Sequence, residues 1–324
     1  MKITVLGSGT WGTALAMLLE KNGHSVILWS FFEEEIEELR KNHTHKYLKN
    51  SQISENIVLT SNLDQVIDSD MLVLAVPSHV VRKTCKALAK YEKIPLIVNV
   101  AKGFDEDTNQ RLSEVIQEEL GESCVVLSGP THAEEVAREI PSAIVAACGD
   151  VKKAQLVQKA FMNDYFRVYT NSDVVGVEIS GALKNVIALC AGISDGSGYG
   201  DNTKAALMTR GIKEIARLGS AMGGNVETFM GLTGIGDLIV TCTSMHSRNR
   251  KAGILIGQGK SPDDAVAQVG MVVEGIKSCI CAKKIADSMN VEMPIVNTAY
   301  DVLYNGVSPE IAVRTLMTRE SKHE

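Results

Sequence analysis

Two lysines stand at positions where an amine could take part in catalysis. Lys102 follows residues 96–100, an apolar segment with the pattern of a buried strand. Lys184 lies within residues 177–193, an otherwise largely apolar segment that we predict to be a helix. Partial desolvation there would lower the pKa of a lysine toward neutrality, which suits a proton donor or acceptor. The alternatives are an ordinary surface lysine at 102 and, at 184, a side chain that extends to solvent beside Asn185.

A basic stretch, Ser247-Arg248-Asn249-Arg250-Lys251, offers donors for an anion. The chain has 33 Lys and Arg against 39 Asp and Glu, a net charge of −6, so an anionic ligand needs a local cluster of cations. Arg248 offers a bidentate guanidinium, and Ser247 and Asn249 add neutral donors. The stretch therefore indicates a phosphate site, and an exposed charge run at a helix start is the alternative.

The basic stretch follows a glycine-rich turn, residues 231–237, which ends in Asp237. Another segment, Ser-Gly-Pro-Thr-His at 128–132, closes a predicted strand and could line the same cleft. A structural turn is the alternative interpretation of 128–132.

The segment Gly7-Ser-Gly9-Thr-Trp-Gly12 has the spacing of a dinucleotide-binding turn. It follows a predicted strand at 3–6 and opens a predicted helix that ends at residue 21. Gly7 allows the tight turn, Gly9 lets the backbone approach a pyrophosphate, and Gly12 lets the helix pack closely on the strand. The helix N-terminus adds unpaired N–H groups and a positive dipole. A dinucleotide cofactor makes hydride transfer to a carbonyl the reaction that would use the lysines.

The sequence leaves open whether the cofactor is NAD or NADP. A carboxylate for the ribose of NAD, or an arginine for the 2′-phosphate of NADP, is expected about 20 residues past the glycine turn. That region reads Trp29-Ser-Phe-Phe-Glu33, with neither a strand-end Asp nor an Arg. Phe31 and Phe32 either flank the adenine or pack in the fold, and we expect residues 33–38 to be a solvated helix face.

Length and composition limit the remaining function classes. The 324 residues suffice for about two domains, and the acidic balance argues against a general nucleic-acid or anionic-membrane binder. The longest apolar runs, 71–77 and 186–193, are far shorter than a membrane span, and the N-terminus lacks the features of a signal peptide, so we expect a cytosolic protein. Seven cysteines without a C-x-x-C pair indicate buried thiols rather than disulfides or zinc, and His43 and His45 lack partners for a metal.

Strand-like and helical segments alternate in the first half of the chain, which is typical of an α/β, doubly wound, mostly parallel Rossmann-type sheet. The predicted strands are 3–6, 25–29, 71–76, 96–100, 124–127, 143–147 and 166–168, and the predicted helices are 11–21, 33–42, 79–91, 109–120 and 151–163. Beyond residue 176 the segments 177–193, 203–222, 273–289, 296–304 and 309–317 are helical, and in 203–222 a buried stripe is expected at Ala205, Met208, Ile212, Ile215 and Leu218. We therefore predict a dinucleotide-binding domain over 1–176 and an all-helical substrate and catalytic domain over 177–324.

Seven segments of the chain, in order, resemble bacterial NAD(P)-dependent glycerol-3-phosphate dehydrogenase over essentially its whole length. They are residues 7–16, 101–103, 127–135, 176–185, 231–238, 246–249 and 273–275. The resemblance implies NAD(P)H-dependent, reversible reduction of dihydroxyacetone phosphate to sn-glycerol 3-phosphate, the backbone precursor of phospholipids. It implies no metal, and together with the apolar stripes of the helical domain it favours a homodimer.

The resemblance also implies roles for individual residues. Lys184 would exchange the proton at the substrate C2 oxygen, Lys102 would polarise that oxygen, and Asp237 would orient Lys184. The rest of the substrate pocket would be Gly129, Thr131, Thr241, Ser247, Arg248 and Asn249. Cofactor contacts besides the glycine turn would come from Thr10, Trp11, Lys102, Ala133, Arg248, Val272 and Glu274.

Three residues of the implied site depart from the family pattern. Phe31 and Phe32 stand where relatives often carry His or Arg, which argues against a strong preference for NADP. Thr131 replaces the usual Ser and keeps the hydroxyl. Two alternatives to this function are a related two-domain dehydrogenase for another anionic hydroxyacid or sugar acid, and a dinucleotide-sensing or scaffold protein without turnover.

Overall fold

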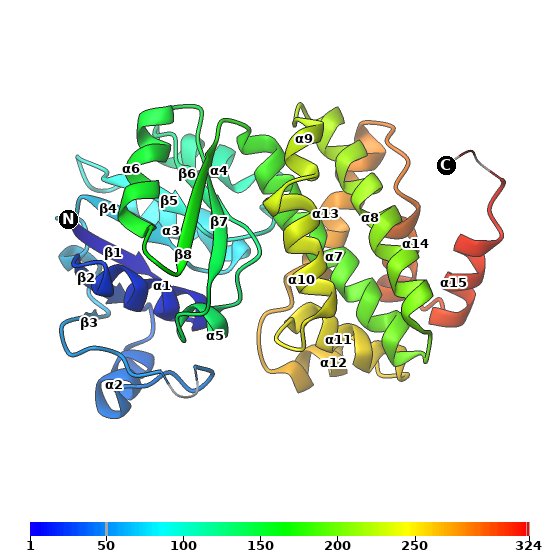
Figure 1. The fold of residues 1–324 in the computed structure, drawn as a ribbon, viewed down its shortest axis with the longest axis horizontal. Coiled ribbons are helices and arrows are strands. Elements are labelled where there is room, and N and C mark those ends of the chain that lie inside the picture. The colour runs from blue at the N-terminus through cyan, green and yellow to red at the C-terminus, as the bar shows by residue number, and fades with distance from the viewer. Residues whose placement is uncertain (49–50, 322, 324) are drawn as a thin grey trace. The chain divides into compact units, whose positions relative to one another are not determined.

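The computed structural model describes residues 1–48, 51–321 and 323. The chain divides into two compact units. The first unit comprises Met1–Asp105 and Gln110–Glu178, and the second comprises Glu106–Asn109 and Ile179–Glu324. Figure 1 shows strands and helices in the first unit and helices in the second, so the predicted fold class is confirmed.

The first unit contains one eight-stranded sheet with the order β3-β2-β1-β4-β5-β6-β7-β8. Neighbouring strands are parallel except for β6 and β7, which are antiparallel. The strands are β1 Lys2–Leu6, β2 Ser25–Trp29, β3 Val58–Thr60, β4 Met71–Leu74, β5 Leu96–Asn99, β6 Val125–Ser128, β7 Ser142–Ala147 and β8 Phe166–Asn171. All seven predicted strands are present, and the sequence missed β3, a three-residue strand whose first residue, Val58, is exposed.

Helices cover this sheet on both faces, as the complete burial of its central strands requires. Helix α1 packs against α5 and α6, and α3 packs against α4. The helices are α1 Thr10–Lys21, α2 Glu33–Asn42, α3 Val81–Leu88, α4 Leu112–Leu120, α5 Ala133–Val136 and α6 Val151–Phe161. Parallel register aligns Leu6 with both Trp29 and Leu74, so β1, β2 and β4 end at one edge of the sheet. The glycine turn begins at that edge.

The second unit is helical. Its long helix α7 (Val174–Gly196) starts in the first unit, and the others are α8 Asp201–Ala221, α9 Val226–Phe229, α10 Asp237–Thr243, α11 Arg248–Gly257, α12 Pro262–Val269, α13 Glu274–Ser288, α14 Pro294–Tyr304 and α15 Pro309–Met317. A five-residue π-helical segment, Leu232–Gly236, leads directly into α10. In α8 the stripe is buried at Ile212, Ile215 and Leu218 but Ala205 is exposed, so the sequence overstated the stripe at its N-terminal end.

Helix α7 is long and apolar enough to cross a membrane by length and composition alone. Its most apolar 18 residues have a mean hydropathy of 1.6, and 83% of that window is buried inside the protein. A buried core helix passes the same test, and the burial identifies α7 as such a helix. The sequence suggested only shorter apolar runs because Glu178, Lys184 and Asn185 interrupt them.

Candidate active site

The glycine turn between β1 and α1 has a geometry that side chains would prevent. Gly7 has a φ of +120°, and a Cβ there would lie 2.7 Å from the backbone oxygen of Ala75. A Cβ on Gly12 would lie 1.9 Å from the backbone oxygen of Gly7, so α1 can approach the turn this closely only with glycine at that position. At Gly9, no atom of a described residue other than its two chain neighbours lies within 4 Å of the Cβ position. That side of the turn is open to a ligand.

The N-terminus of α1 is suited to bind an anion. Its N-cap residue, Gly9, supplies no side-chain acceptor for the first N–H groups of the helix. Thr10 follows, and its buried Oγ1 has no hydrogen-bond partner within the described part of the chain. Trp11 is half-buried beside it. Unpaired N–H groups, the helix dipole and an unused hydroxyl fit the diphosphate of a dinucleotide.

Phe31 and Phe32, just beyond β2, do not pack in the core. The two residues are 65% and 56% exposed, and their rings meet edge to face with centroids 5.3 Å apart. Lys83 places its Nζ 5.2 Å from the centroid of Phe31. Of the two interpretations that the sequence left open, packing in the fold is therefore wrong.

Glu35 makes polar contacts that its place in the sequence does not indicate. It lies on the exposed face of α2, as predicted for residues 33–38, but its Oε2 also accepts hydrogen bonds from two buried serines. The Oγ of Ser8 lies 2.5 Å away and that of Ser30 2.6 Å away. Ser8 belongs to the glycine turn and Ser30 follows β2. Serines at two neighbouring strand ends were the available signal, but a contact between residues 27 apart depends on the fold.

Lys102 lies beyond the carboxyl end of β5, and the structure brings it to the segment that follows β6. Its Nζ donates to the backbone oxygen of Gly129 at 3.1 Å. The same oxygen accepts from the Oγ1 of Thr131 at 3.3 Å. Ala133, a buried residue, then begins the short helix α5. Three predicted substrate residues, Lys102, Gly129 and Thr131, are thus neighbours at one edge of the sheet.

Lys184 is buried in the second unit and is held by two polar side chains. Its Nζ donates to Asp237 Oδ1 at 2.5 Å and to Thr241 Oγ1 at 2.8 Å. The three residues are only 7%, 1% and 4% exposed, so the lysine does not extend to solvent. An ammonium and a carboxylate at this depth lose their hydration and must compensate each other. The cluster therefore holds one amine in a defined position within an apolar helix.

The π-helical segment positions the partners of Lys184. A Cβ on Gly234 would lie 1.9 Å from the backbone oxygen of Phe229, so the segment folds this tightly only with glycine there. It leads into α10, whose first residue is Asp237. Thr241 is one turn further on the same face, and its Oγ1 donates to the backbone oxygen of Asp237 at 2.6 Å. The glycine-rich turn of the sequence is thus what aims both side chains at α7.

The basic stretch divides into residues of different character. Ser247 is the N-cap of α11, where its Oγ accepts from the backbone N–H of Arg250. Arg250 points back to α7, and its Nε and Nη2 donate to Asp195 at 2.9 and 2.6 Å. Arg248 is exposed, and its guanidinium has no partner within the described ranges. Arg248 is therefore the arginine of this pair that remains open to an anion.

Helix α11 lies in backbone contact with α7 through glycines on both helices. A Cβ on Gly253 would lie 2.1 Å from the backbone oxygen of Leu189, and one on Gly192 would lie 2.1 Å from that of Arg250. One turn along, Gly196 and Gly257 show the same close approach. No side chain lies between the helices at these points. The position of Arg248 on α11 is therefore fixed relative to Lys184 on α7.

Asn249 connects three helices beside this contact. Its Nδ2 donates to Asn185 Oδ1 at 2.9 Å, next to Lys184. Its Oδ1 accepts from the backbone N–H of Gly275 at 2.8 Å, in the first turn of α13. Val272 and Glu274, two further predicted contacts, lie at the start of α13 and are half-buried. The structure therefore brings the predicted residues of α7, α11 and the α13 start to one place.

The cysteines add no reactive group to this site. All seven cysteines are free and all but Cys190 are buried; burial raises the pKa of the Cys85 and Cys279 thiols to about 12, which makes them unreactive. Among the described residues no group of three or more His, Cys, Asp and Glu could hold a metal ion.

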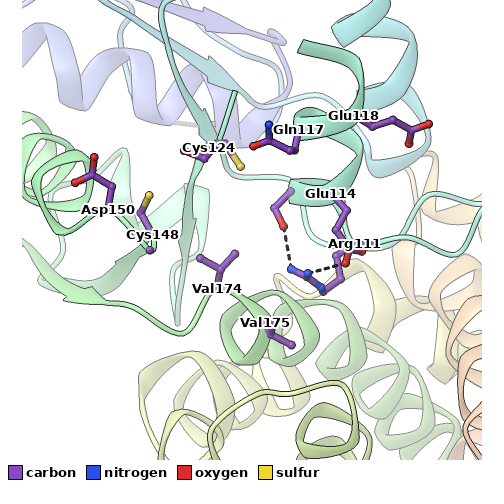
Figure 2. Close-up of a pocket in the computed structure, with 12 residues that line it drawn as sticks. Arg111, Glu114, Gln117, Glu118, Cys124, Cys148, Asp150, Val174 and Val175 are labelled. Atoms are coloured by element: carbon purple, nitrogen blue, oxygen red, sulfur yellow. Dashed lines mark hydrogen bonds and ion pairs between the residues drawn. The ribbon is translucent and has the colours of Figure 1, made fainter. Parts of the chain in front are cut away.

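A cavity of 670 Å³ lies in the first unit, beside α4 and the start of β6 (Figure 2). Arg111 lines it, and its guanidinium donates to Glu114 and to the buried Glu178, whose pKa is raised by burial. Cys124 lies at the amino end of β6, whereas Gly129 lies just past the carboxyl end. The cavity is therefore at the opposite edge of the sheet from the glycine turn, and none of the predicted site residues lines it.

The doubly wound sheet, the open glycine turn and the helical second unit define a dinucleotide-dependent oxidoreductase. Two family models for NAD-dependent glycerol-3-phosphate dehydrogenase match most of the chain, the N-terminal model at residues 2–154 and the C-terminal model at 173–314. The chain belongs to the NAD-dependent glycerol-3-phosphate dehydrogenase family.

Individual relatives agree with this assignment. The glycerol-3-phosphate dehydrogenase (NAD(P)+) of Fusobacterium nucleatum is 54% identical over 330 residues, which cover 100% of this chain and 98% of the relative. The one from Clostridium botulinum strain Eklund 17B is 50% identical over 326 residues, with 100% and 99% coverage. The crystal structure of glycerol-3-phosphate dehydrogenase from Coxiella burnetii is 34% identical, with a TM-score of 0.95 and coverage of 98% of this chain and 99% of that one.

Proposed function

We propose that this protein catalyses the NAD(P)H-dependent reduction of dihydroxyacetone phosphate to sn-glycerol 3-phosphate and the reverse oxidation, and so supplies the backbone of glycerophospholipids. The observation that carries the proposal is the buried cluster of Lys184, Asp237 and Thr241. Reduction of a ketone requires a proton donor held at the carbonyl oxygen, and a buried amine held by two side chains meets that requirement. Relatives more than 50% identical that carry the glycerol-3-phosphate dehydrogenase name support the choice of substrate.

The glycine turn is proposed to bind the cofactor diphosphate. The open side of Gly9 and the unpaired N–H groups at the start of α1 support this assignment. When bound, the reduced nicotinamide supplies the hydride. The residues to which we assign cofactor contacts are Gly7, Gly9, Thr10, Trp11, Gly12, Phe31, Phe32, Lys102, Ala133, Arg248, Val272 and Glu274.

Lys184 is proposed to move the proton. Its Nζ donates a proton to the C2 oxygen as the ketone becomes an alcohol, and in the oxidation it takes the proton back. Asp237 and Thr241 hold the Nζ in place, which limits the reorganisation that proton transfer would otherwise need. Lys102 is proposed to add positive charge near the same oxygen and so stabilise the developing alkoxide.

The phosphate of the substrate is assigned to the start of α11. Arg248 has an exposed guanidinium that can bind a phosphate through two donors. Ser247 and Asn249 flank it, although the Asn249 amide also joins α7 to α13 and so contributes to the shape of the pocket. Gly129 and Thr131, which lie beside Lys102, complete the proposed substrate contacts.

We propose further features of the protein together with the reaction. We propose a dinucleotide-binding domain over residues 1–176 and a helical substrate domain over 177–324. We also propose a homodimer in the cytoplasm whose partners are small molecules rather than nucleic acid or membranes. Light scattering of the purified protein measures the subunit number directly.

The test is the initial rate of dihydroxyacetone phosphate reduction, followed by loss of absorbance of NADH and NADPH in parallel assays. We expect turnover with at least one cofactor. A panel of 2-keto acids serves as the comparison. Turnover of a keto acid without turnover of dihydroxyacetone phosphate would assign the chain to another dehydrogenase reaction. Tight binding of the reduced cofactor with no turnover of any substrate would indicate a dinucleotide sensor.

A further inference from the structure

We propose that Glu35 is the residue that selects NAD over NADP in this protein, by accepting a hydrogen bond from the adenosine ribose. The proposal rests on the proposed function, since it names the form of the cofactor that this dehydrogenase uses. It stands on the contacts of Glu35 with Ser8 and Ser30, which place a carboxylate between the glycine turn and the end of β2.

The position of Glu35 follows from the parallel register of the first two strands. Leu6 and Trp29 are register partners, and the backbone N–H of Gly7 donates to the oxygen of Trp29 at 2.9 Å. Ser8 and Ser30 therefore follow the ends of two hydrogen-bonded strands. In a sheet of this kind the diphosphate binds at the first strand end and the adenosine ribose lies toward the second. A carboxylate shared by the two strand ends is thus at the ribose position.

The carboxylate is held in place although its helix face is exposed. The hydroxyls of Ser8 and Ser30, both on buried residues, donate to the same oxygen, Oε2. The backbone N–H of Phe32 donates to Ser30 Oγ at 3.3 Å, which orients that hydroxyl. The next residue, Ile36, is fully buried and anchors α2. No described residue donates to Oε1, so this oxygen is available to a hydroxyl of the ligand.

A fixed carboxylate distinguishes the two cofactors by charge. The 2′-hydroxyl of NAD can donate to Oε1, whereas the 2′-phosphate of NADP has no such donor and carries negative charge toward another negative group. Two cations, one on α2 and one on α3, are already engaged with other groups. Arg40 donates to Glu33 and to the backbone oxygen of Leu59, and Lys83 lies over the Phe31 ring. One charge-assisted hydrogen bond corresponds to about 10- to 100-fold in affinity.

Binding of two fragments tests the proposal without any turnover. Calorimetry gives the Kd of ADP-ribose and of 2′-phospho-ADP-ribose for the wild-type protein, for Glu35→Gln and for the control Glu34→Gln, whose exposed side chain makes no hydrogen bond to a described residue. We expect the wild type to bind ADP-ribose about 10- to 100-fold more tightly than the phosphorylated fragment. Glu35→Gln should bring the ratio of the two Kd values below about 3-fold, mainly by tighter binding of the phosphorylated fragment. Glu34→Gln should keep the wild-type ratio.

Other outcomes overturn the proposal. It is wrong if the wild type binds both fragments equally or prefers the phosphorylated one, or if Glu35→Gln leaves the ratio unchanged. Ser30→Ala removes one of the two hydroxyls that hold the carboxylate and should give an intermediate ratio; a wild-type ratio would mean that this contact does not position Glu35. The fragments contain no nicotinamide, so failure to reduce dihydroxyacetone phosphate would refute the proposed reaction and leave the fragment ratios as an independent result.

Discussion

Substitution of Gly253 by alanine tests whether backbone contact between α7 and α11 fixes the proposed site. The new Cβ would lie 2.1 Å from the backbone oxygen of Leu189 and 2.8 Å from the backbone nitrogen of Ile193. Carbon-to-oxygen contacts in proteins begin at about 3.3 Å, so the helices must separate by about 1.2 Å. The obstructing atoms belong to the backbone of α7, so no side-chain rotation can relieve the contact.

Two effects of opposite sign determine the stability of Gly253→Ala. Alanine favours the helix by about 1 kcal/mol relative to glycine. Overpacking of a closely packed region costs about 1–3 kcal/mol, and more where rigid atoms collide. Since the collision involves backbone atoms, we expect the steric term to dominate and the melting temperature to fall by roughly 2–8 °C. A displacement of about 1 Å of α11 relative to Lys184 should also lower kcat by about 10- to 100-fold.

The assay combines a thermal melt with the rate of dihydroxyacetone phosphate reduction. Gly257→Ala should behave in the same way, because its Cβ would lie 2.3 Å from the backbone oxygen of Ile193. Gly200→Ala is the matched control, since no atom of a described residue other than its two chain neighbours lies within 4 Å of that Cβ position. Its rate should equal that of the wild type. A Gly253→Ala protein as stable and as active as Gly200→Ala would show that α7 and α11 do not touch at this point.

Three further predictions concern side chains of the second unit. Lys184→Ala should lower kcat by about 10²–10⁴-fold, and near-normal turnover in a folded variant would remove Lys184 from the mechanism. Arg248→Ala should mainly raise the KM for dihydroxyacetone phosphate, and an unchanged KM would place the phosphate elsewhere. Burial raises the pKa of Glu214 to about 7. Between pH 4.5 and 7 this carboxyl is therefore ionised in the unfolded chain but still protonated in the folded protein, so the free energy of unfolding falls as the pH rises. Urea unfolding should show that the free energy of unfolding of Glu214→Gln, relative to that of the wild type, rises by up to about 3 kcal/mol from pH 4.5 to pH 8. A difference between the two proteins that is independent of pH would contradict the raised pKa of Glu214.

The parts of the fold that the sequence predicted are those with a strong local signal. The buried strands are continuous apolar runs bounded by polar residues, and the glycine turn has a fixed spacing between a strand and a helix. Strand β3 has three residues and lies at the edge of the sheet, so its pairing with β2 rather than its own pattern makes it a strand. Ala205 matched the helical period of its segment, but the structure leaves it exposed, and the period alone does not indicate where burial ends.

The candidate site could be predicted by residue type but not by contact. Lys184 drew attention as a charge in an apolar helix, and the structure supplies Asp237 as its partner 53 residues away. The basic stretch could not be divided from sequence, because Arg248 and Arg250 differ only in what the fold places beside them: Asp195 pairs with Arg250. Glu35 could not be distinguished from the other exposed glutamates of its helix, because its contacts with Ser8 and Ser30 also depend on the fold.

The glycine contacts and the buried ion pair are connected by the requirements of proton transfer. Lys184 and Asp237 lose their hydration in the helical unit, and a well-packed apolar pair would often be equally or more stable there. Stability therefore does not explain why this pair lies in the longest apolar helix of the described chain. Catalysis does, because an amine on a flexible side chain is useful only where its neighbours fix it. The carboxylate of Asp237 and the hydroxyl of Thr241 fix the amine of Lys184. The backbone contacts at Gly192 and Gly253 fix α7, which carries Lys184, against α11.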